Sequence, residues 1–194
     1  MNAVAASRSI RDLLMTASGL NFTADHFSLL GVARVQRLDI AALEQRFRDV
    51  QAQVHPDKHA HAGEADKRLA MQWATRINEA YQTLKNPLNR ARYLLQLLGY
   101  DPQVESNTAM PVEFLMAQME LREAVTDARV AGDEAALDDA RDRLLGEMKA
   151  EYLKLAELID QQENYSAATG LVRQLMFQEK LLNEIDDALE AVTA

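Results

Sequence analysis

The chain has 194 residues, no cysteine and a net charge of −9, and 48% of its residues are hydrophobic. The absence of cysteine excludes disulfides, thiolate-held metal clusters and cysteine nucleophiles, and no apolar run approaches the length of a membrane span. Gly, Pro and β-branched residues are few beside Ala, Leu, Glu and Gln, which predicts an all-α protein.

The first part of the chain is interpreted as an extension followed by two helices. Residues 1–24 have no sustained apolar period and only faintly resemble an Arg- and Ser-rich transit peptide, so we expect a flexible extension. Asp25 is placed to cap a short helix that Gly31 ends. Asp39 is placed to cap the next helix, residues 40–54. The apolar positions of that helix recur every three or four residues and form one face, which comprises Leu43, Phe47, Val50 and Val54.

A second long helix is predicted from about residue 63 to residue 84. Its apolar face comprises Ala70, Trp73, Ile77, Ala80, Tyr81 and Leu84. Two long helices joined by a short loop form an antiparallel hairpin. Pro87 is suited to the first position of a further short helix, which we expect to end near Gly99.

Residues 99–111 carry Gly or Pro signals at both ends and no apolar period, so we predict a linker there. Three helices are expected beyond it: about 112–130, from the Gly132-Asp133 turn to about 161, and about 165–191. Their short connections predict an antiparallel three-helix bundle. The predicted core of the bundle comprises Phe114, Ala117, Leu121, Ala124, Val125, Ala128, Leu137, Leu144, Met148, Tyr152, Leu155, Ile159, Leu171, Leu175, Leu182, Ile185 and Leu189.

Charge is divided unevenly between the two parts of the chain. Residues 25–98 carry 11 Lys and Arg against 8 Asp and Glu, whereas residues 99–194 carry 8 against 21. A slightly basic part joined to an acidic part indicates two surfaces with different partners. The acidic part also argues against a nucleic-acid partner, because phosphates would be repelled.

The loop between the two long helices carries His55, Pro56, Asp57 and Lys58. Pro56 disfavours helix at its own position and at His55, so we expect these polar side chains to face solvent. Proline also restricts the loop and so reduces the entropy lost on docking, while the Asp57 carboxylate suits a bidentate Arg. Taken alone, the same residues are also compatible with a simple helix terminator.

This loop, the run Ile77-Asn78-Glu79-Ala80-Tyr81-Gln82-Thr83-Leu84 and Pro87 together resemble a J-domain, the module that stimulates the ATPase of seventy-kilodalton heat-shock-class chaperones. The runs Arg90-Ala91-Arg92-Tyr93-Leu94-Leu95, Phe114-Leu115-Met116 and Met119-Glu120-Leu121-Arg122-Glu123 resemble one branch only, the HscB family of iron–sulfur cluster assembly. The resemblance covers about residues 25–190. It implies an N-terminal J-domain (25–98), which is a helical hairpin with short flanking helices, the linker (99–111), and a C-terminal three-helix client-binding domain (112–194).

The resemblance implies that the first site binds an HscA-type ATPase chaperone in its ATP-bound state. Its residues would be His55, Pro56, Asp57 and Lys58, with Arg46 and Arg48 on the preceding helix, and an Arg of the chaperone would meet Asp57. J-domain helices before this loop are often rich in Lys and Arg, whereas here Glu44 and Asp49 offset Arg46 and Arg48.

A second site is predicted on the helix that begins near residue 112. At about 100° per residue, Leu115, Met116 and Met119 point away from the predicted core, and charged residues border them. Such side chains either pack on other helices or form an exposed apolar patch with a charged rim, which is typical of a binding site. The HscB resemblance favours binding and implies an IscU-type scaffold protein as the partner. The predicted site comprises Leu115, Met116, Met119, Glu120, Arg122, Glu123 and Phe177.

The favoured function is a J-type co-chaperone that delivers an iron–sulfur scaffold protein to an HscA-type chaperone and stimulates its ATP hydrolysis. We expect the bacterial cytoplasm rather than the mitochondrial matrix, no membrane partner, no cofactor and no enzymatic activity. No P-loop motif is present, so we do not expect the chain itself to bind ATP by a P-loop. A general J-protein for other clients is one alternative, but it predicts a Gly/Phe-rich linker or zinc ribbon that the chain lacks. A small metalloenzyme that uses His55, His59 and His61 is another, although no His-Glu-x-x-His pattern supports metal binding.

Overall fold

The computed structural model describes residues 21–54, 63–100 and 110–193, and the regular structure in these ranges is entirely α-helical. Most of the predicted extension, the loop with His55 to Lys58 and most of the predicted linker lie outside these ranges. The helices are α2 (His26–Leu30), α3 (Ile40–Val54), α4 (Glu64–Lys85), α5 (Pro87–Leu97), α6 (Val112–Ala131), α7 (Glu134–Asp160) and α8 (Tyr165–Thr193). The prediction of an all-α protein is therefore confirmed.

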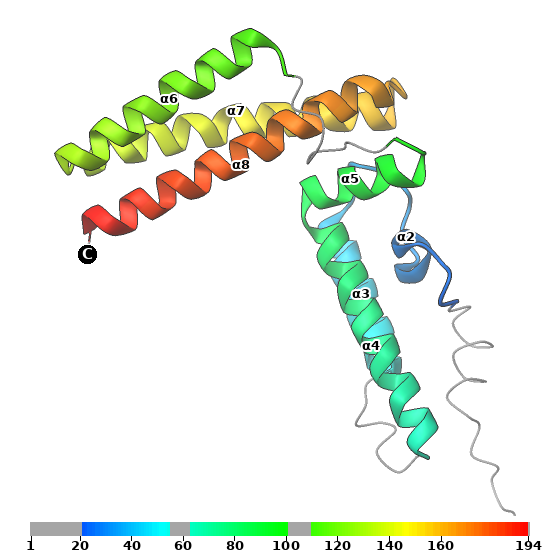
Figure 1. Ribbon diagram of the computed structural model, residues 1–194. Helices are drawn as coiled ribbons and strands as arrows, with labels where there is room; N and C mark the ends of the chain where they lie inside the picture. Colours follow the sequence, from blue (N-terminus) through cyan, green and yellow to red (C-terminus); the bar gives the residue numbers. More distant parts are fainter. Residues whose placement is uncertain (1–20, 55–62, 101–109, 194) are drawn as a thin grey trace, which may run out of the picture. The chain divides into compact units, whose positions relative to one another are not determined.

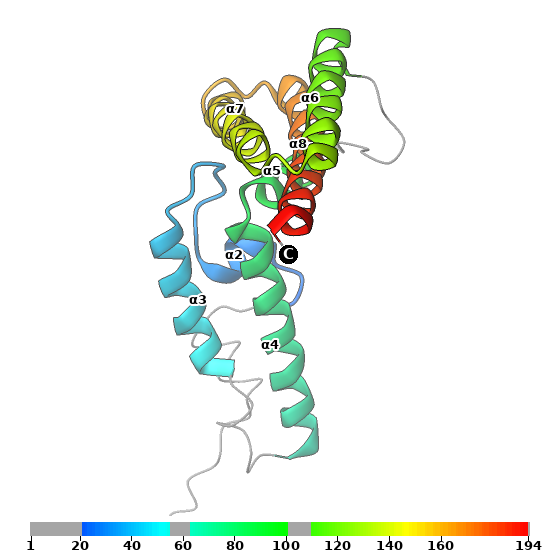
Figure 2. The same cartoon turned by 90° about the vertical axis from the view of Figure 1, so that its left-hand side faces the viewer.

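Internal contacts divide the chain into two compact units, residues 1–34 with 38–89 and residues 35–37 with 90–194. In the first unit, α3 and α4 lie side by side and α2 packs against both (Figures 1 and 2). None of the helices in the described ranges combines the length and the apolar character needed to cross a bilayer.

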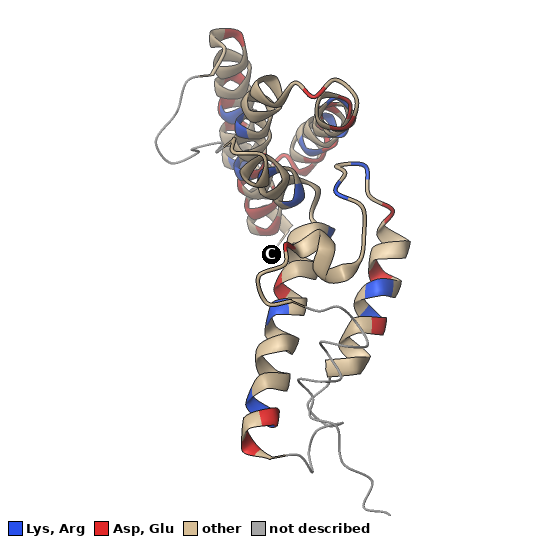
Figure 3. Cartoon of the chain, turned by 90° about the vertical axis from the view of Figure 1, so that its right-hand side faces the viewer, with Lys and Arg blue, Asp and Glu red and all other residues tan. Residues whose placement is uncertain are grey.

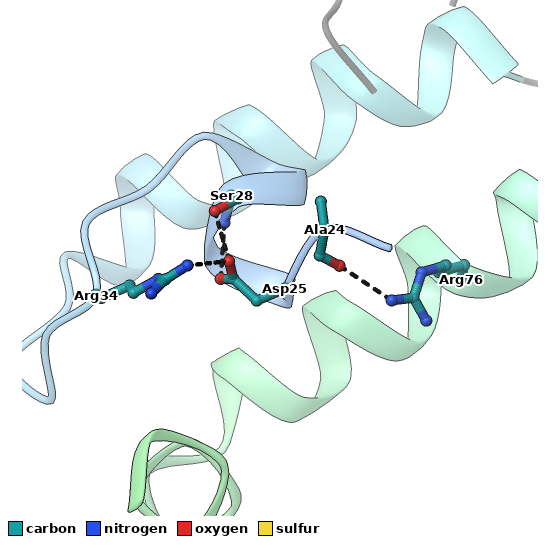
Figure 4. A network of polar contacts seen from close by, with 5 residues as sticks. All are labelled: Ala24, Asp25, Ser28, Arg34 and Arg76. Carbon is teal, nitrogen blue, oxygen red and sulfur yellow. Dashed lines mark hydrogen bonds and ion pairs between the residues drawn. The ribbon is translucent and has the colours of Figure 1, made fainter. Parts of the chain in front are cut away.

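Local signals fix the ends of α2 as predicted. Asp25 accepts a hydrogen bond from the Ser28 backbone nitrogen at 3.1 Å, and Gly31 ends the helix in the left-handed conformation at φ 63°. Arg34 forms an ion pair with Asp25, and Arg76 of α4 donates to the Ala24 carbonyl at 3.0 Å (Figure 4). The Arg76 bond joins the start of α2 to α4, and the Arg34 ion pair joins it to the loop that follows α2.

The predicted core of the hairpin is confirmed on α4 and modified on α3. All six predicted α4 positions are buried, and so are Leu43, Val50 and Val54 of α3. Phe47, the fourth predicted position, is only half-buried. Its ring stacks on Tyr81 of α4, with ring centroids 4.1 Å apart. Phe47 therefore covers the edge of the core rather than filling its centre.

In the second unit, α6, α7 and α8 contact one another pairwise and form the predicted three-helix bundle. Gly132 ends α6 at φ 67°, and Asp133 accepts from the Ala136 nitrogen at 3.0 Å to cap α7. Most of the predicted core positions of α7 and α8 are buried. The exceptions are Tyr152, Leu182 and Leu189, which are half-buried.

The core face of α6 was predicted incorrectly at three positions. Ala117 and Ala124 are exposed, Phe114 is half-buried, and the buried residues are Gln118, Leu121, Val125 and Ala128. These residues recur at steps of three and four, so they form one stripe. Ala117 and Ala124 lie at the edge of that stripe, where a small side chain is too short to reach the neighbouring helices.

The second unit also includes Val35–Arg37. The Asp160 carboxylate at the end of α7 accepts from the backbone nitrogens of Gln36 at 2.6 Å and Arg37 at 2.7 Å. Arg90, which is buried, donates from Nε to the Gln36 carbonyl at 2.9 Å. Burial lowers the pKa of Arg90, and the charge of Asp160 opposes that shift. The segment is thus held by one buried cation and one carboxylate.

Candidate functional site

The predicted chaperone-binding residues His55, Pro56, Asp57 and Lys58 lie outside the described residues. The helices that frame them are described: α3 ends at Val54 and α4 begins at Glu64. The remaining two predicted residues of this site, Arg46 and Arg48, lie on α3.

Arg46 makes a structural contact within the first unit. Its Nε donates to the Leu30 carbonyl at 3.3 Å, so it joins α3 to the last turn of α2. Its guanidinium occupies the space where a Cβ on residue 31 would stand. Gly31 is therefore required by its positive φ, whereas the Arg46 guanidinium is the far end of a flexible side chain and can move aside.

Arg48 belongs to a polar cluster on the exposed side of α3. It donates to the side-chain amide oxygen Oε1 of Gln45 at 2.7 Å, and Gln45 Nε2 donates in turn to the Asp49 carboxylate at 2.8 Å. Basic and acidic residues lie close together along this helix (Figure 3). The α3 surface beside the loop is consequently balanced in charge, as its sequence predicts.

The second predicted site is centred on exposed methionines of α6. Met116 is 57% exposed and Met119 is 69% exposed. They line a shallow surface depression of about 580 Å³. The depression is bordered by Glu120, Arg122, Glu123 and Thr126. We call Met116, Met119, Glu120, Arg122 and Glu123 the α6 patch.

Two further members of the predicted site are less exposed than expected. Leu115 and Phe177 are half-buried. The Phe177 ring meets the Phe114 ring edge-on at 6.1 Å, and the Arg122 guanidinium lies over the Phe177 ring at 5.4 Å from the centroid. Phe177 therefore packs against two residues of α6 and also borders the patch.

Glu184 belongs to this arrangement and was not among the predicted residues. Arg122 donates from Nε and Nη2 to the two carboxylate oxygens of Glu184, at 2.8 and 3.0 Å. Glu184 lies seven residues after Phe177 on α8, so both face α6. That spacing was visible in the sequence, but the pairing of α6 with α8 in this register was not.

A polar cluster lies on the α7–α8 side of the bundle. Glu151 accepts from Gln178 Nε2 at 3.3 Å, and Tyr152 donates to Glu179 at 3.3 Å. Burial raises the pKa of Glu151, while its hydrogen bond to Gln178 opposes the shift. Burial likewise raises the pKa of Glu179. Among the described residues, no three His, Asp or Glu side chains gather closely enough to hold a metal ion.

Comparison with known proteins agrees with this division of the chain. The DnaJ domain model matches residues 25–93, and the model for the HSCB C-terminal oligomerisation domain matches residues 110–186. A helical hairpin matched by the first, joined to a bundle matched by the second, defines a J-domain co-chaperone.

Similar proteins are found in bacteria and in humans. A co-chaperone protein HscB homolog of Ralstonia nicotianae is 51% identical over 172 residues, which cover 88% of this chain and 98% of the relative. The structure of chaperone HscB from Vibrio cholerae has a TM-score of 0.75 at 36% identity, covering 87% of this chain and 99% of that chain. Human co-chaperone protein HscB has a TM-score of 0.80 at 27% identity, covering 86% and 82%. The chain belongs to the HscB family of J-domain co-chaperones, which take part in iron–sulfur cluster assembly.

Proposed function

We propose that this protein binds an IscU-type scaffold protein through the C-terminal bundle and delivers it to an HscA-type ATPase chaperone. In this scheme the J-domain stimulates ATP hydrolysis by the chaperone, and the co-chaperone performs no catalysis itself. The observation that carries the proposal is the exposure of Met116 and Met119 within a charged rim. Large exposed apolar side chains of this kind are typical of protein–protein interaction sites.

The α6 patch suits a protein partner physically. Methionine side chains adapt to irregular apolar surfaces, and the bordering charges of Glu120, Arg122 and Glu123 supply orientation and specificity. Leu115 and Phe177 complete the proposed scaffold site from their half-buried positions. Because α6 remains anchored by Leu121 and Val125, the patch is presented on a rigid helix.

The chaperone site is proposed to consist of His55, Pro56, Asp57 and Lys58, with Arg48 beside them. The Asp57 carboxylate would receive an Arg of the ATP-bound chaperone. Stimulation requires contacts that differ between two chaperone conformations, since only differential binding shifts an equilibrium. Arg46 is proposed to contribute mainly by holding α3 against α2, because its Nε is already bonded to Leu30.

The relative from Ralstonia nicotianae, which is 51% identical, is bacterial. The proposed location is therefore the bacterial cytoplasm. A pull-down with the full chain as bait, in the presence of ATP, tests the proposal. Recovery of both an IscU-type scaffold and an HscA-type chaperone is the expected result. Recovery of many unrelated unfolded proteins without the scaffold would contradict it and favour a general J-protein.

A further inference from the structure

The guanidinium of Arg122 is held along one edge only. Nε and Nη2 donate to the two oxygens of Glu184 at 2.8 and 3.0 Å. Arg presents five N–H groups in a planar fork, so three remain on the two terminal nitrogens. No other described residue accepts a hydrogen bond from them.

The guanidinium also lies over an aromatic ring. Its central carbon lies 5.4 Å from the Phe177 centroid. Glu184 and Phe177 both belong to α8, whereas Arg122 belongs to α6. A bidentate pair combined with a ring contact leaves a long side chain few alternative rotamers. Arg122 is thereby held in one orientation at the rim of the depression that Met116 and Met119 line.

We propose that Glu184 is a positioning residue for partner binding at the α6 patch. It holds Arg122 so that the terminal N–H groups form a preset fork for a carboxylate of the bound protein. This inference rests on the proposed function, because it assumes that the α6 patch binds the scaffold. The partner surface is accordingly an apolar one with an Asp or Glu beside it. Fixing Arg122 before binding reduces the side-chain entropy that is lost when the complex forms.

A neighbouring ion pair offers a matched control. Arg141 Nε of α7 lies 2.7 Å from Asp186 Oδ1, with side chains 39% and 44% exposed. The corresponding exposures of Arg122 and Glu184 are 40% and 48%. Asp186 is two residues from Glu184 on the same helix, so neutralising either one changes the net charge equally. Only Glu184 holds an arginine that lines the α6 depression.

The test is calorimetric binding of the full chain to the purified IscU-type scaffold of the same organism. Glu184→Gln should weaken binding by about threefold or more, whereas Asp186→Asn should stay within about twofold of the native protein. Arg122→Ala should also weaken binding. In the Arg122→Ala background, Glu184→Gln should have no additional effect, because its target is gone. Thermal melts of each variant verify that the bundle is folded.

Native-like scaffold affinity of Glu184→Gln or of Arg122→Ala would overturn the inference. So would a loss of affinity in Asp186→Asn equal to that in Glu184→Gln, or a double variant that loses the sum of both single losses. An equal loss in Asp186→Asn would indicate general electrostatics, and an additive loss would mean that Glu184 contacts the partner by itself. Met119→Ala separates this test from the proposed function. If Met119→Ala binds normally, the scaffold site is misplaced; if it binds weakly while Glu184→Gln binds normally, only the role of Glu184 is wrong.

Discussion

The ring of Phe47 stacks on the ring of Tyr81, with centroids 4.1 Å apart and ring planes inclined by 16°. This contact joins the middle of α3 to the C-terminal part of α4, which are the two helices that carry the proposed chaperone-binding loop. Tyr81 in turn lies beneath the ammonium of Lys85, at 5.4 Å, and Lys85 pairs with Glu44 at 3.7 Å. The stacked rings and this ion pair therefore join α3 to α4 along one side of the hairpin.

Phe47→Ala should lower the free energy of unfolding of the first unit by about 2 kcal/mol. The expected cost is below that of a fully buried phenylalanine because Phe47 is half-buried. Stimulation of the chaperone should fall as the hairpin loosens. Thermal melts followed by circular dichroism test this, with the exposed Gln51→Ala on the same helix as a control. A native melting curve for Phe47→Ala would mean that the stacked pair contributes nothing to stability.

Gly31→Ala should destabilise the first unit by about 1–2 kcal/mol from the left-handed backbone alone. An added Cβ would also displace the Arg46 guanidinium and weaken its bond to Leu30. Gly63→Ala is the matched control, because Gly63 has φ −64° and open space around its Cα. Chemical denaturation of both variants measures the difference. Equal stability of the two would show that the α2 terminus tolerates a side chain.

Much of the fold could be predicted from short-range signals. Asp25, Gly31, Pro87 and the Gly132-Asp133 turn act within a few residues, so the sequence alone places the helix ends correctly. The α4 face was also predictable, because its stripe contains large apolar residues at nearly every position.

Long-range pairings were not predictable from these signals. Gln118 is buried and Ala117 is exposed, although hydropathy predicts the opposite. Which of the two is buried depends on where α7 and α8 lie against α6. The bonds from Asp160 to the backbone at residues 36 and 37 join residues more than a hundred positions apart. The role of Glu184 depends in the same way on the register between α6 and α8. The methionines of the α6 patch were predictable because they lie opposite a recognisable core stripe.

Met119→Ala and Leu121→Ala should have opposite effects. Met119 is exposed, so its truncation should cost about 1–2 kcal/mol of scaffold affinity and almost no stability. Leu121 is buried, so its truncation should cost about 2–5 kcal/mol of stability. Paired melts and binding calorimetry separate the two effects.

Leu153→Ala on α7 is the control for the α6 patch, because Leu153 is 58% exposed and lies outside the depression. It should leave both stability and scaffold affinity unchanged. If Leu153→Ala weakens binding as much as Met119→Ala does, the scaffold contact is not confined to α6.

Glu151→Gln should stabilise the second unit at neutral pH by about 0.5–1 kcal/mol. Burial raises the folded-state pKa of Glu151 above its ordinary value. Between the ordinary pKa and the raised folded-state pKa, the folded protein binds more protons at Glu151 than the unfolded protein does. The free energy of unfolding therefore rises as pH falls through the folded-state pKa toward the ordinary pKa. Denaturant titrations from pH 7 to pH 4.5 should show this gain in the native protein and a smaller gain in the variant. Identical pH profiles would mean that the Glu151 carboxylate is not destabilised by burial.

The central claim is that one chain couples scaffold binding to ATP hydrolysis by a partner chaperone. The most direct measurement is the steady-state ATPase rate of the purified HscA-type chaperone with the scaffold, in the presence of native protein, Asp57→Asn or Met119→Ala. Native protein should stimulate strongly, and Asp57→Asn should not stimulate at all, although it binds the scaffold normally and melts within about 0.5 kcal/mol of native stability. Met119→Ala should stimulate normally without scaffold but lose the additional effect of the scaffold. Full stimulation by Asp57→Asn would contradict the account.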